Sequence, residues 1–574
     1  MASNIPDASG NPSKILHWLV KNPSWTLVLA TLLGLMPFLA KPFNIDDPLF
    51  IWVARQIAVH PFDPYGFKVN WYGAPMWMWQ ATENPPLSSY YLAVVAAVLG
   101  WSEVALHAAM LLPAVAVILG TWRLARQFCS HPLLVALITL FTPGFLVSST
   151  TIMCDVMMLA FWVWAVVYWM EGLEQKSNLR LVVSGCLIAL ATLTKYYGLC
   201  LVPLLAVYTL VARKRLDWRL VWLLIPVGAI AWYQWQTHML YGKALFSGAT
   251  EYVSSAKSSH QFSLISMGLI TLAFGGACAA PVIFFISRLW RSRMLAALVG
   301  ACVIICCADL LWHHGHTVWE RFPAVQSNAR WLLFVQFTFW LFGGVVILAL
   351  TLSNLRHLFD AKSWLLALWV GGTFIFTANF NWTINARSLL PMIPAVGILL
   401  VRQLERTRPS GFNPFSRGVL VCLGISAGLA WLTAQADFQY AVAVRQAVQG
   451  ILTNRVDDRS PVWFEGHWGF QYYMEKDGAL AVNLSSPSIQ PGDVLVVHLQ
   501  NTGFVAPDVR QAIVEKTLAV AGPHWLSTWN RNVGAGFYSA NLGPLPFAFG
   551  SVSPEQFVLY RWQTNPPPLT VSPP

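Results

Sequence analysis

Long apolar runs, separated by short polar connections, occupy most of the chain up to residue 437. A helix needs roughly 20 apolar residues to cross a bilayer, and about thirteen runs reach or approach that length. The pattern therefore predicts a polytopic α-helical membrane protein with about thirteen transmembrane helices. The predicted spans are 22–40, 104–122, 132–149, 156–171, 181–195, 198–212, 220–237, 263–287, 294–312, 331–352, 364–379, 387–402 and 418–436.

The pattern changes after residue 437. Short runs rich in β-branched and aromatic residues occur at 462–464, 493–497 and 557–560, and Gly and Pro residues separate them. Such runs are typical of strands in a small α/β domain. We therefore predict a transmembrane domain at 1–437 and a small soluble α/β domain at 438–574.

The composition supports a membrane protein. Of the 574 residues, 56% are hydrophobic and only 11% are charged, which excludes an ordinary soluble enzyme. Many of the 29 Trp and 33 Phe lie near the ends of the apolar runs, as expected for aromatic belts at the two membrane surfaces. None of the nine Cys lies after Cys422, and their positions predict neither a disulfide framework nor a zinc site.

The net charge is +11, and the basic residues form short clusters in alternate connections. Cytoplasmic connections are enriched in Lys and Arg, so these clusters predict orientation in the membrane and do not indicate a nucleic-acid partner. We expect a multi-pass inner (plasma) membrane protein with a cytoplasmic N-terminus, a first extracytoplasmic loop at 41–103 and an extracytoplasmic domain at 438–574. Within that loop, the apolar stretch 87–100 predicts a helix that lies on the outer surface of the membrane or dips into it. The basic clusters are Lys14 and Lys21; Arg123 and Arg126; Lys176 and Arg180; Arg213, Lys214, Arg215 and Arg219; Arg288, Arg291 and Arg293; Arg356 and Lys362; and Arg402, Arg406, Arg408 and Arg417.

Ionisable residues occur where the predicted spans end on the outer side. Asp46 and Asp47 follow the first span, and Glu83 lies in the first loop. Asp155 begins the fourth span, and Lys195 ends the fifth. At this boundary a carboxylate can accept a proton from an attacking hydroxyl or hold a divalent cation, and an amine can neutralise a phosphate. The topology therefore predicts one site that combines carboxylate side chains with the amine of a lysine.

Two further groups lie on the same predicted side. Arg387 opens the twelfth span, and its planar guanidinium could bind a phosphate or a lipid headgroup, or anchor the helix at the interface. His313, His314, His316 and Glu320 lie together in an outer loop. That set could bind a metal, although a solvated loop is the interpretation we favour.

Each residue of the acidic site also has a structural interpretation. Asp47 could cap a surface helix that begins at Pro48, since Asp before Pro is a strong helix start. Asp155 could cap the fourth span, and Lys195 could be an interfacial lysine whose stem reaches toward water. Glu83 could be a solvated residue before a stiff turn. Their shared side and depth favour a common site over separate structural roles.

Several motifs that contain these residues have set places in a known family. They are the acid pair Asp46-Asp47 after the first span, Glu83-Asn84-Pro85-Pro86 in the first loop, Asp155 at the start of the fourth span, Thr194-Lys195 near the end of the fifth, the late Arg387-Ser388-Leu389-Leu390-Pro391, and the Gly/aromatic-rich stretch from Gly466 to Tyr473. Together they resemble the GT-C membrane glycosyltransferases of family 39. That group includes protein O-mannosyltransferases and the lipid A aminoarabinose transferase.

The resemblance implies a GT-C fold and transfer of a hexosyl or pentosyl group from a polyprenyl-phosphate carrier. The acceptor would be a hydroxyl of a lipid, glycan or protein at the outer face, and direct displacement would invert the anomeric carbon. A divalent metal cation is a candidate cofactor. The resemblance implies that Asp46 is the general base and that Asp47 orients it or shares its task. Glu83 and Asp155 would form the acceptor and sugar site, and they are also the candidate metal ligands. Lys195 and Arg387 would bind the phosphate.

The chain departs from this family at two positions. Asp47 stands where the family usually has Glu, and Asn84 stands where the aminoarabinose enzyme has Lys. The sugar specificity of that enzyme is therefore not carried over to this chain. The tail after residue 438 also lacks clear signs of the repeated β-trefoil of eukaryotic protein mannosyltransferases.

Two other functions compete with glycosyl transfer. A transporter or flippase of a lipid-linked saccharide would also place charges in membrane helices, but it predicts acids at the bilayer midplane and an inverted repeat. A scaffold or sensor would leave the acid-rich first loop without a role. The chain has no Gly-rich nucleotide loop between a strand and a helix, which favours a lipid-linked donor and membrane lipids as partners.

Overall fold

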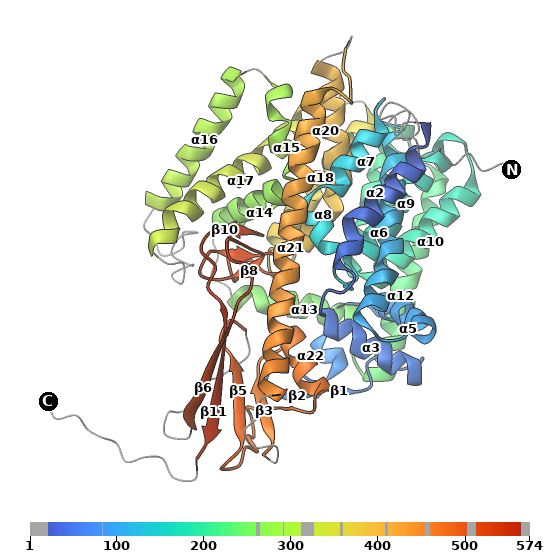
Figure 1. The fold of residues 1–574 in the computed structure, drawn as a ribbon. Coiled ribbons are helices and arrows are strands. Elements are labelled where there is room, and N and C mark those ends of the chain that lie inside the picture. Colours follow the sequence, from blue (N-terminus) through green and yellow to red (C-terminus); the bar gives the residue numbers. More distant parts are fainter. Residues whose placement is uncertain are drawn as a thin grey trace, which may run out of the picture.

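A bundle of long helices forms most of the molecule, and a smaller part that contains a sheet lies beyond one end of the bundle (Figure 1). The computed structural model describes residues 21–82, 84–259, 264–290, 292–311, 327–355, 360–407, 411–453, 460–501 and 512–563. We call the end of the bundle nearest the sheet the sheet end. The predicted fold class, a helical membrane protein with a C-terminal α/β region, is confirmed.

Helices coincide with all of the predicted spans. Within the described ranges, seven helical segments are long and apolar enough to cross a membrane: Glu103–Ala125, Asp155–Glu174, Tyr196–Arg213, Arg330–Asn354, Ala361–Asn379, Ala386–Thr407 and Arg417–Thr453. Shorter apolar helices account for other predicted spans. The helices of the bundle are α2 (Pro23–Leu35), α6 (Glu103–Ala125), α7 (Pro132–Leu140), α8 (Pro143–Ser148), α9 (Asp155–Glu174), α10 (Asn178–Thr194), α11 (Leu201–Arg213), α12 (Leu224–Tyr241), α14 (Leu264–Cys278), α15 (Pro281–Phe284), α16 (Ser292–Leu311), α17 (Ser327–Asn354), α18 (Ala361–Asn379), α19 (Ala386–Leu389), α20 (Ile393–Thr407) and α21 (Arg417–Thr453).

Three predicted spans do not form one regular α-helix in the structure because proline interrupts them. Pro143 separates α7 from α8, Pro281 separates α14 from α15, and Pro391 lies between α19 and α20. Proline lacks the N–H that continues a helix, and its ring clashes with the preceding turn. The first two runs therefore consist of two shorter helices, whereas the third continues as one helical segment through a 3₁₀ turn at Leu390–Met392.

Helix α21 is longer than the sequence pattern indicates. Its 37 residues give a length of about 55 Å, and it continues past the predicted domain boundary at residue 437. Figure 1 shows α21 running from the bundle to the sheet. The same helix therefore belongs to both parts of the molecule.

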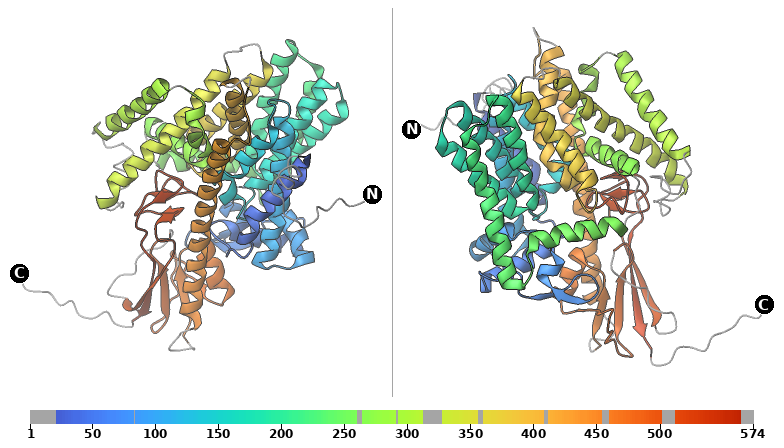
Figure 2. Two further views of the ribbon diagram at one scale, coloured as in Figure 1. Left: turned by 45° about the horizontal axis from the view of Figure 1, so that its top comes forward. Right: turned by 180° about the vertical axis from the view of Figure 1, so that it is seen from behind.

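The first loop folds against the sheet end of the bundle. It contains α3 (Asp47–Val59), β1 (Lys68–Asn70), β2 (Pro75–Trp77), α4 (Met78–Ala81) and α5 (Leu87–Leu99). Helix α5 lies where the apolar stretch 87–100 predicts a helix, and it packs against α3 and α6. Its place at a membrane surface stays a prediction. Helix α13 (Leu245–Ser259) also runs across this end of the bundle (Figure 2).

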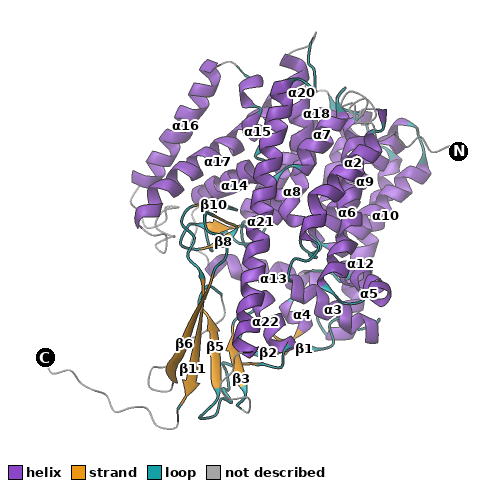
Figure 3. Ribbon diagram, viewed as in Figure 1, coloured by secondary structure: helices purple, strands orange, loops and turns teal. Residues whose placement is uncertain are grey.

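The sheet beyond the bundle is mixed, and Figure 3 separates it clearly from the helices. In the part of the chain that is described, it has five strands in the order β4-β3-β5-β11-β6. Strand β3 is parallel to β4 and β5, whereas β11 is antiparallel to β5 and β6. The three strands expected from sequence are present as β3 (Val462–Glu465), β5 (Val494–His498) and β11 (Glu555–Trp562), joined by β4 (Leu480–Ala481), β6 (Ala512–Val520) and the helix α22 (Trp468–Lys476).

Residues 525–550, which we call the docking segment, leave the sheet and pack on the bundle. They form two short strand pairs, β7 (Leu526–Ser527) with β10 (Ala548–Phe549) and β8 (Trp529–Asn530) with β9 (Ala535–Gly536). The Ala386 N–H donates to the Phe537 carbonyl at 2.9 Å, and the Ala540 N–H donates to the Ile384 carbonyl at 2.8 Å. The docking segment is thus hydrogen-bonded to the start of α19.

Candidate active site

The acid pair lies in a tight turn between α2 and α3. Ile45, the residue before it, has a φ of +48°, which a β-branched residue rarely adopts. Asp47 is fully buried and accepts hydrogen bonds from the Asn44 N–H at 2.9 Å and the Ile152 N–H at 3.1 Å. Asp47 therefore does more than start α3: its carboxylate joins the turn to the segment between α8 and α9.

The two acids of the pair have different surroundings. Burial raises the pKa of Asp47 to about 7, while the charge of Lys41 and the two amide hydrogen bonds oppose that rise. The side chain of Asp46 is 27% exposed and its Oδ2 accepts a hydrogen bond from Arg387 at 2.9 Å. Asp46 is thus the member of the pair that a reactant could reach.

Asp46, Asp155, Lys195 and Arg387 converge at the sheet end, and we call them the open cluster. The Lys195 Nζ donates to Asp155 Oδ1 at 2.6 Å. Arg387 lies between the two acids, with its other terminal nitrogen 3.9 Å from Asp155 Oδ2. These residues come from four separate helix ends. The structure brings them together at one end of the bundle, where the sequence places them.

The open cluster has unused hydrogen-bonding groups. Asp155 Oδ2 and Arg387 Nε are buried and lack a hydrogen-bond partner among the described residues. Lys195 remains 23% exposed and Arg387 12% exposed. A polar ligand that entered here could therefore gain hydrogen bonds that the protein alone does not make.

The segment after Glu83 lies beside the open cluster. The Cys154 Sγ, next to Asp155 in the chain, is 3.7 Å from Asn84 Oδ1, and Tyr65 donates to the Asn84 carbonyl at 2.8 Å. Glu83 itself lies outside the described residues, so its predicted role stays a prediction. The predicted histidine-rich outer loop, from His313 to Glu320, also lies outside them.

No group of three or more His, Cys, Asp and Glu residues suited to a metal occurs within the described ranges. Asp155, one of the two candidate ligands, is instead engaged by two cationic side chains. A metal at Glu83 and Asp155 stays a prediction.

A second ion-pair network was missed by the sequence analysis, and we call it the sealed cluster. Lys41 Nζ lies 2.5 Å from Asp437 Oδ2 and 3.1 Å from Thr150 Oγ1. Thr528 and Tyr538 donate to Asp437 at 2.7 and 2.8 Å. Both charged side chains have no exposure to solvent. The signal that could have revealed this network is Asp437 itself, a single acid one residue after an apolar run.

Several of the basic residues predicted to be cytoplasmic lie at the opposite end of the bundle. Asp155 begins α9 and Glu171 lies near its end, so roughly 24 Å separates them along the helix axis. Glu171 binds both Arg123, at 2.8 Å, and Arg180, and Arg402 lies 3.6 Å from Asp360. The charges thus divide between the two ends, as the topology predicts, while the orientation of the ends in a membrane stays a prediction.

The Gly/aromatic-rich stretch forms the turn from β3 into α22 and contacts the acid-pair turn. A Cβ on Gly469 would lie 2.2 Å from the Phe43 carbonyl oxygen, so only glycine allows this approach. The Tyr473 hydroxyl accepts from the Phe43 N–H at 2.8 Å and donates to Glu103 at 2.6 Å. The sheet region therefore supports the backbone that leads to Asp46.

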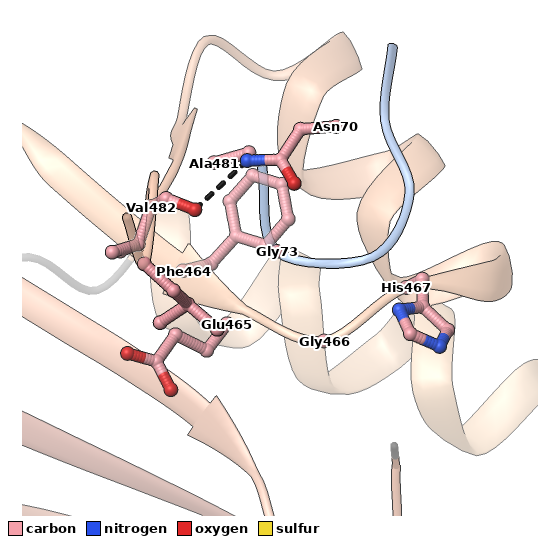
Figure 4. Close-up of a pocket in the computed structure, with 9 residues that line it drawn as sticks. Asn70, Gly73, Phe464, Glu465, Gly466, His467, Ala481 and Val482 are labelled. Atoms are coloured by element: carbon pink, nitrogen blue, oxygen red, sulfur yellow. Dashed lines mark hydrogen bonds between the residues drawn. The ribbon is translucent and has the colours of Figure 1, made fainter. Parts of the chain in front are cut away.

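A small cavity lies in the sheet region, between the β1–β2 hairpin and the end of β3 (Figure 4). Asn70, Gly73, Glu465 and His467 help to line it, and Asn70 donates to the Val482 carbonyl at 2.8 Å. Burial lowers the pKa of His467 to about 4. None of the residues that line this cavity belongs to the open cluster, so we do not assign the reaction to it.

Comparison with known proteins supports the interpretation of the membrane helices. Residues 83–235 match the family model described as dolichyl-phosphate-mannose-protein mannosyltransferase. The matched residues include Asn84, Asp155 and Lys195, whereas Asp46 and Arg387 lie outside them. The match confirms the predicted resemblance to GT-C membrane glycosyltransferases over that segment. No curated protein matches the chain.

Several solved structures have a similar arrangement. The Archaeoglobus fulgidus oligosaccharyltransferase tethered with an acceptor peptide is 13% identical with a TM-score of 0.47, over 83% of this chain and 66% of that chain. ArnT from Cupriavidus metallidurans bound to undecaprenyl phosphate is 12% identical with a TM-score of 0.39, over 84% and 93%. The arabinofuranosyltransferase AftD from Mycobacteria is 12% identical with a TM-score of 0.36, over 96% and 40%. At these TM-scores the similarities identify neither a substrate nor the role of a residue.

Proposed function

We propose that this membrane protein transfers a sugar from a polyprenyl-phosphate carrier to a hydroxyl acceptor at the outer face of the membrane. The proposal builds on the family match of residues 83–235. The observation that carries it is the convergence of Asp46, Asp155, Lys195 and Arg387 at one end of the bundle. This set offers both a proton acceptor and cations for a phosphate.

Lys195 and Arg387 would bind the phosphate of the carrier. A guanidinium offers a planar fork of N–H donors, and an ammonium adds a compact charge, so the two together suit a phosphate. Both side chains keep some exposure to solvent, and the Arg387 Nε has a hydrogen bond to give. Their pairing with acids would hold them in place before the donor arrives.

Asp46 would act as the general base. The acceptor oxygen attacks the anomeric carbon as its proton passes to the Asp46 carboxylate. The bond between that carbon and the phosphate oxygen breaks, and the phosphate leaves with the electron pair. Attack from the face opposite the phosphate inverts the anomeric carbon.

The other predicted residues would shape the site. Asp47 would hold the acid-pair turn through its bonds to Asn44 and Ile152. Glu83 and Asp155 would contact the sugar or acceptor. Because Asp155 is already paired with two cations, we propose no step that depends on a metal. We further propose that the sheet end faces the outside of an inner membrane, with the N-terminus cytoplasmic.

The test is sugar transfer by the purified full chain. Undecaprenyl phosphates that carry different sugars would be incubated with membrane extract, and Asp46→Asn would be compared with wild type. Asp477→Asn is the matched control, because Asp477 is exposed at the end of α22. We expect transfer by wild type and by the control, and almost none by Asp46→Asn. Undiminished transfer by Asp46→Asn would remove the proposed base.

A transporter or flippase gives a different result in the same preparation. It would move a lipid-linked saccharide across a vesicle membrane without forming a glycosylated product. Movement of this kind, with no transfer from any donor, would overturn the proposed reaction.

A further inference from the structure

We propose that Tyr538 of the docking segment is a positioning residue for the Arg387 guanidinium, and that its aromatic ring is the part that acts. The proposal rests on the proposed function, in which Arg387 binds the carrier phosphate. The Arg387 Cζ lies 5.5 Å from the centroid of the Tyr538 ring. A cation over an aromatic ring is attracted to its negative face.

The ring contacts a part of Arg387 that no carboxylate holds. Asp46 and Asp155 engage only the two terminal nitrogens of the guanidinium, at 2.9 and 3.9 Å. Nε has no hydrogen-bond partner among the described residues. The terminal nitrogen nearest Asp155 also donates to Met153 Sδ at 2.7 Å. The ring therefore restrains the planar group through its face, and the N–H edges can exchange their present partners for a phosphate.

Tyr538 is itself held firmly. It is 2% exposed, its hydroxyl donates to Asp437 at 2.8 Å, and its ring packs on Trp529 with centroids 5.8 Å apart. Burial and the neighbouring Asp437 raise the pKa of Tyr538, so the phenol stays protonated and continues to donate. The sealed cluster thus fixes the ring from its hydroxyl end.

The backbone sets the register between the two residues. The Ala386 N–H donates to the Phe537 carbonyl at 2.9 Å, so the immediate neighbours of Arg387 and Tyr538 are bonded to each other. The Phe537 N–H in turn donates to the Thr528 carbonyl at 2.8 Å. These backbone hydrogen bonds therefore place the ring over the guanidinium. The docking segment could shift along α19 only if these hydrogen bonds were broken.

The experiment measures the affinity of the purified full chain in detergent for undecaprenyl phosphate. Tyr538→Leu removes both the ring and the hydroxyl, whereas Tyr538→Phe removes only the hydroxyl. We expect Tyr538→Leu to bind between about 3-fold and 30-fold more weakly than wild type. Tyr538→Phe should bind within about 2-fold of wild type even if it melts at a lower temperature, because the ring is kept.

A graded series keeps the test valid if Tyr538→Leu fails to fold. Phenylalanine rings that carry one, two or three fluorines would replace the side chain at position 538. Fluorine withdraws charge from the ring face and hardly changes its shape, so affinity should fall with each added fluorine. Equal affinity across the series would overturn the role of the ring, as would Tyr538→Phe binding as weakly as Tyr538→Leu.

Arg387→Ala separates this inference from the proposed function. If Arg387→Ala weakens binding and the ring variants do not, the inference is wrong and the phosphate role of Arg387 stands. If Arg387→Ala binds like wild type, the proposed phosphate role is wrong, and the role of Tyr538 is wrong with it.

Discussion

The open and sealed clusters are both built from ion pairs between distant segments, yet they differ in completeness. In the sealed cluster, Asp437 accepts three hydrogen bonds and Lys41 donates two, all without contact with solvent. In the open cluster, Asp155 and Arg387 each keep a buried atom that has no hydrogen-bond partner within the described ranges, and Asp46 and Lys195 reach solvent. If the reaction takes place at the open cluster, as we propose, the difference teaches that a buried charge alone does not indicate a reaction site. Polar groups that lack hydrogen-bond partners and lie beside solvent are a better indication of a reaction site.

The comparison leads to opposite expectations for mutants. Removing one partner of a sealed pair leaves an uncompensated charge in a dry interior, which is costly to stability. Removing a residue of a partly exposed pair costs less stability, because water can replace the lost partner. Variants of the sealed cluster should therefore fail to fold well, whereas variants at Asp46 and Lys195, the two more exposed members of the open cluster, should fold and fail to react.

The largest expected effect is the loss of activity in Asp46→Asn. Loss of a general base lowers rates by about 100-fold to 10,000-fold, and the partly exposed position of Asp46 should keep the free energy of unfolding within about 1 kcal/mol of wild type. Initial rates of sugar transfer and thermal melting of the same sample would check both parts. A melting temperature that falls in step with activity would place Asp46 with the sealed cluster instead.

Lys41→Met should be the most destabilising of the single changes. It leaves Asp437 charged and buried, at an expected cost of about 3–5 kcal/mol in the free energy of unfolding. The double variant Lys41→Met with Asp437→Leu should recover much of that loss, because no isolated charge remains. Lys243→Met is the matched control, since Lys243 is 48% exposed and should be near neutral. Melting in detergent measures all of these variants, and a double variant no better than Lys41→Met would contradict this account.

Asp47 should make stability depend on pH in an unusual direction. Its folded-state pKa of about 7 lies above the ordinary 3.8, so the folded protein keeps a proton that the unfolded chain has lost. Stability should therefore fall as pH rises between these values and level off above pH 7, with a loss of about 3 kcal/mol between pH 5 and pH 8. The slope of melting temperature against pH should be flatter in Asp47→Asn than in wild type or in Asp477→Asn. Parallel slopes for all three proteins would show that Asp47 ionises normally.

The smallest expected effect is a gain in binding. In the absence of a donor, Arg387 pairs with Asp46, so a phosphate must compete with that carboxylate. Asp46→Asn should therefore bind undecaprenyl phosphate about 3-fold to 10-fold more tightly than wild type while transferring no sugar. Equilibrium binding in detergent would measure the change. Weaker binding would mean that Asp46 helps to hold the donor and does not compete with it.

The sequence predicted the convergence of the open cluster because its members lie at span ends. Once the basic connections assign the sides, Asp155 and Lys195 must lie at the same end as Asp46. The sealed cluster could not be predicted in this way. Lys41 and Asp437 are 396 residues apart, and each seemed to lie in a connection outside the membrane helices.

Other differences have local causes. Proline at positions 143 and 281 divides runs whose apolar content is continuous, and Pro391 gives a 3₁₀ turn within a third, since hydropathy does not register a missing N–H. The docking segment has little regular structure of its own, and it is ordered by backbone bonds to residues far away in the chain. Tyr538 therefore gave no signal in the sequence, although the three main strands of the sheet did.

Helix α21 has a consequence for building chimeras of this protein. It carries Asp437 into the sealed cluster and, two turns later, places Arg445 2.6 Å from Glu103. A recombination joint at residue 437 would cut a continuous helix between these two anchors. Exchange of the sheet region with that of a relative should instead use a joint after Thr453. The incoming part must include a docking segment whose side chains can donate hydrogen bonds to Asp437.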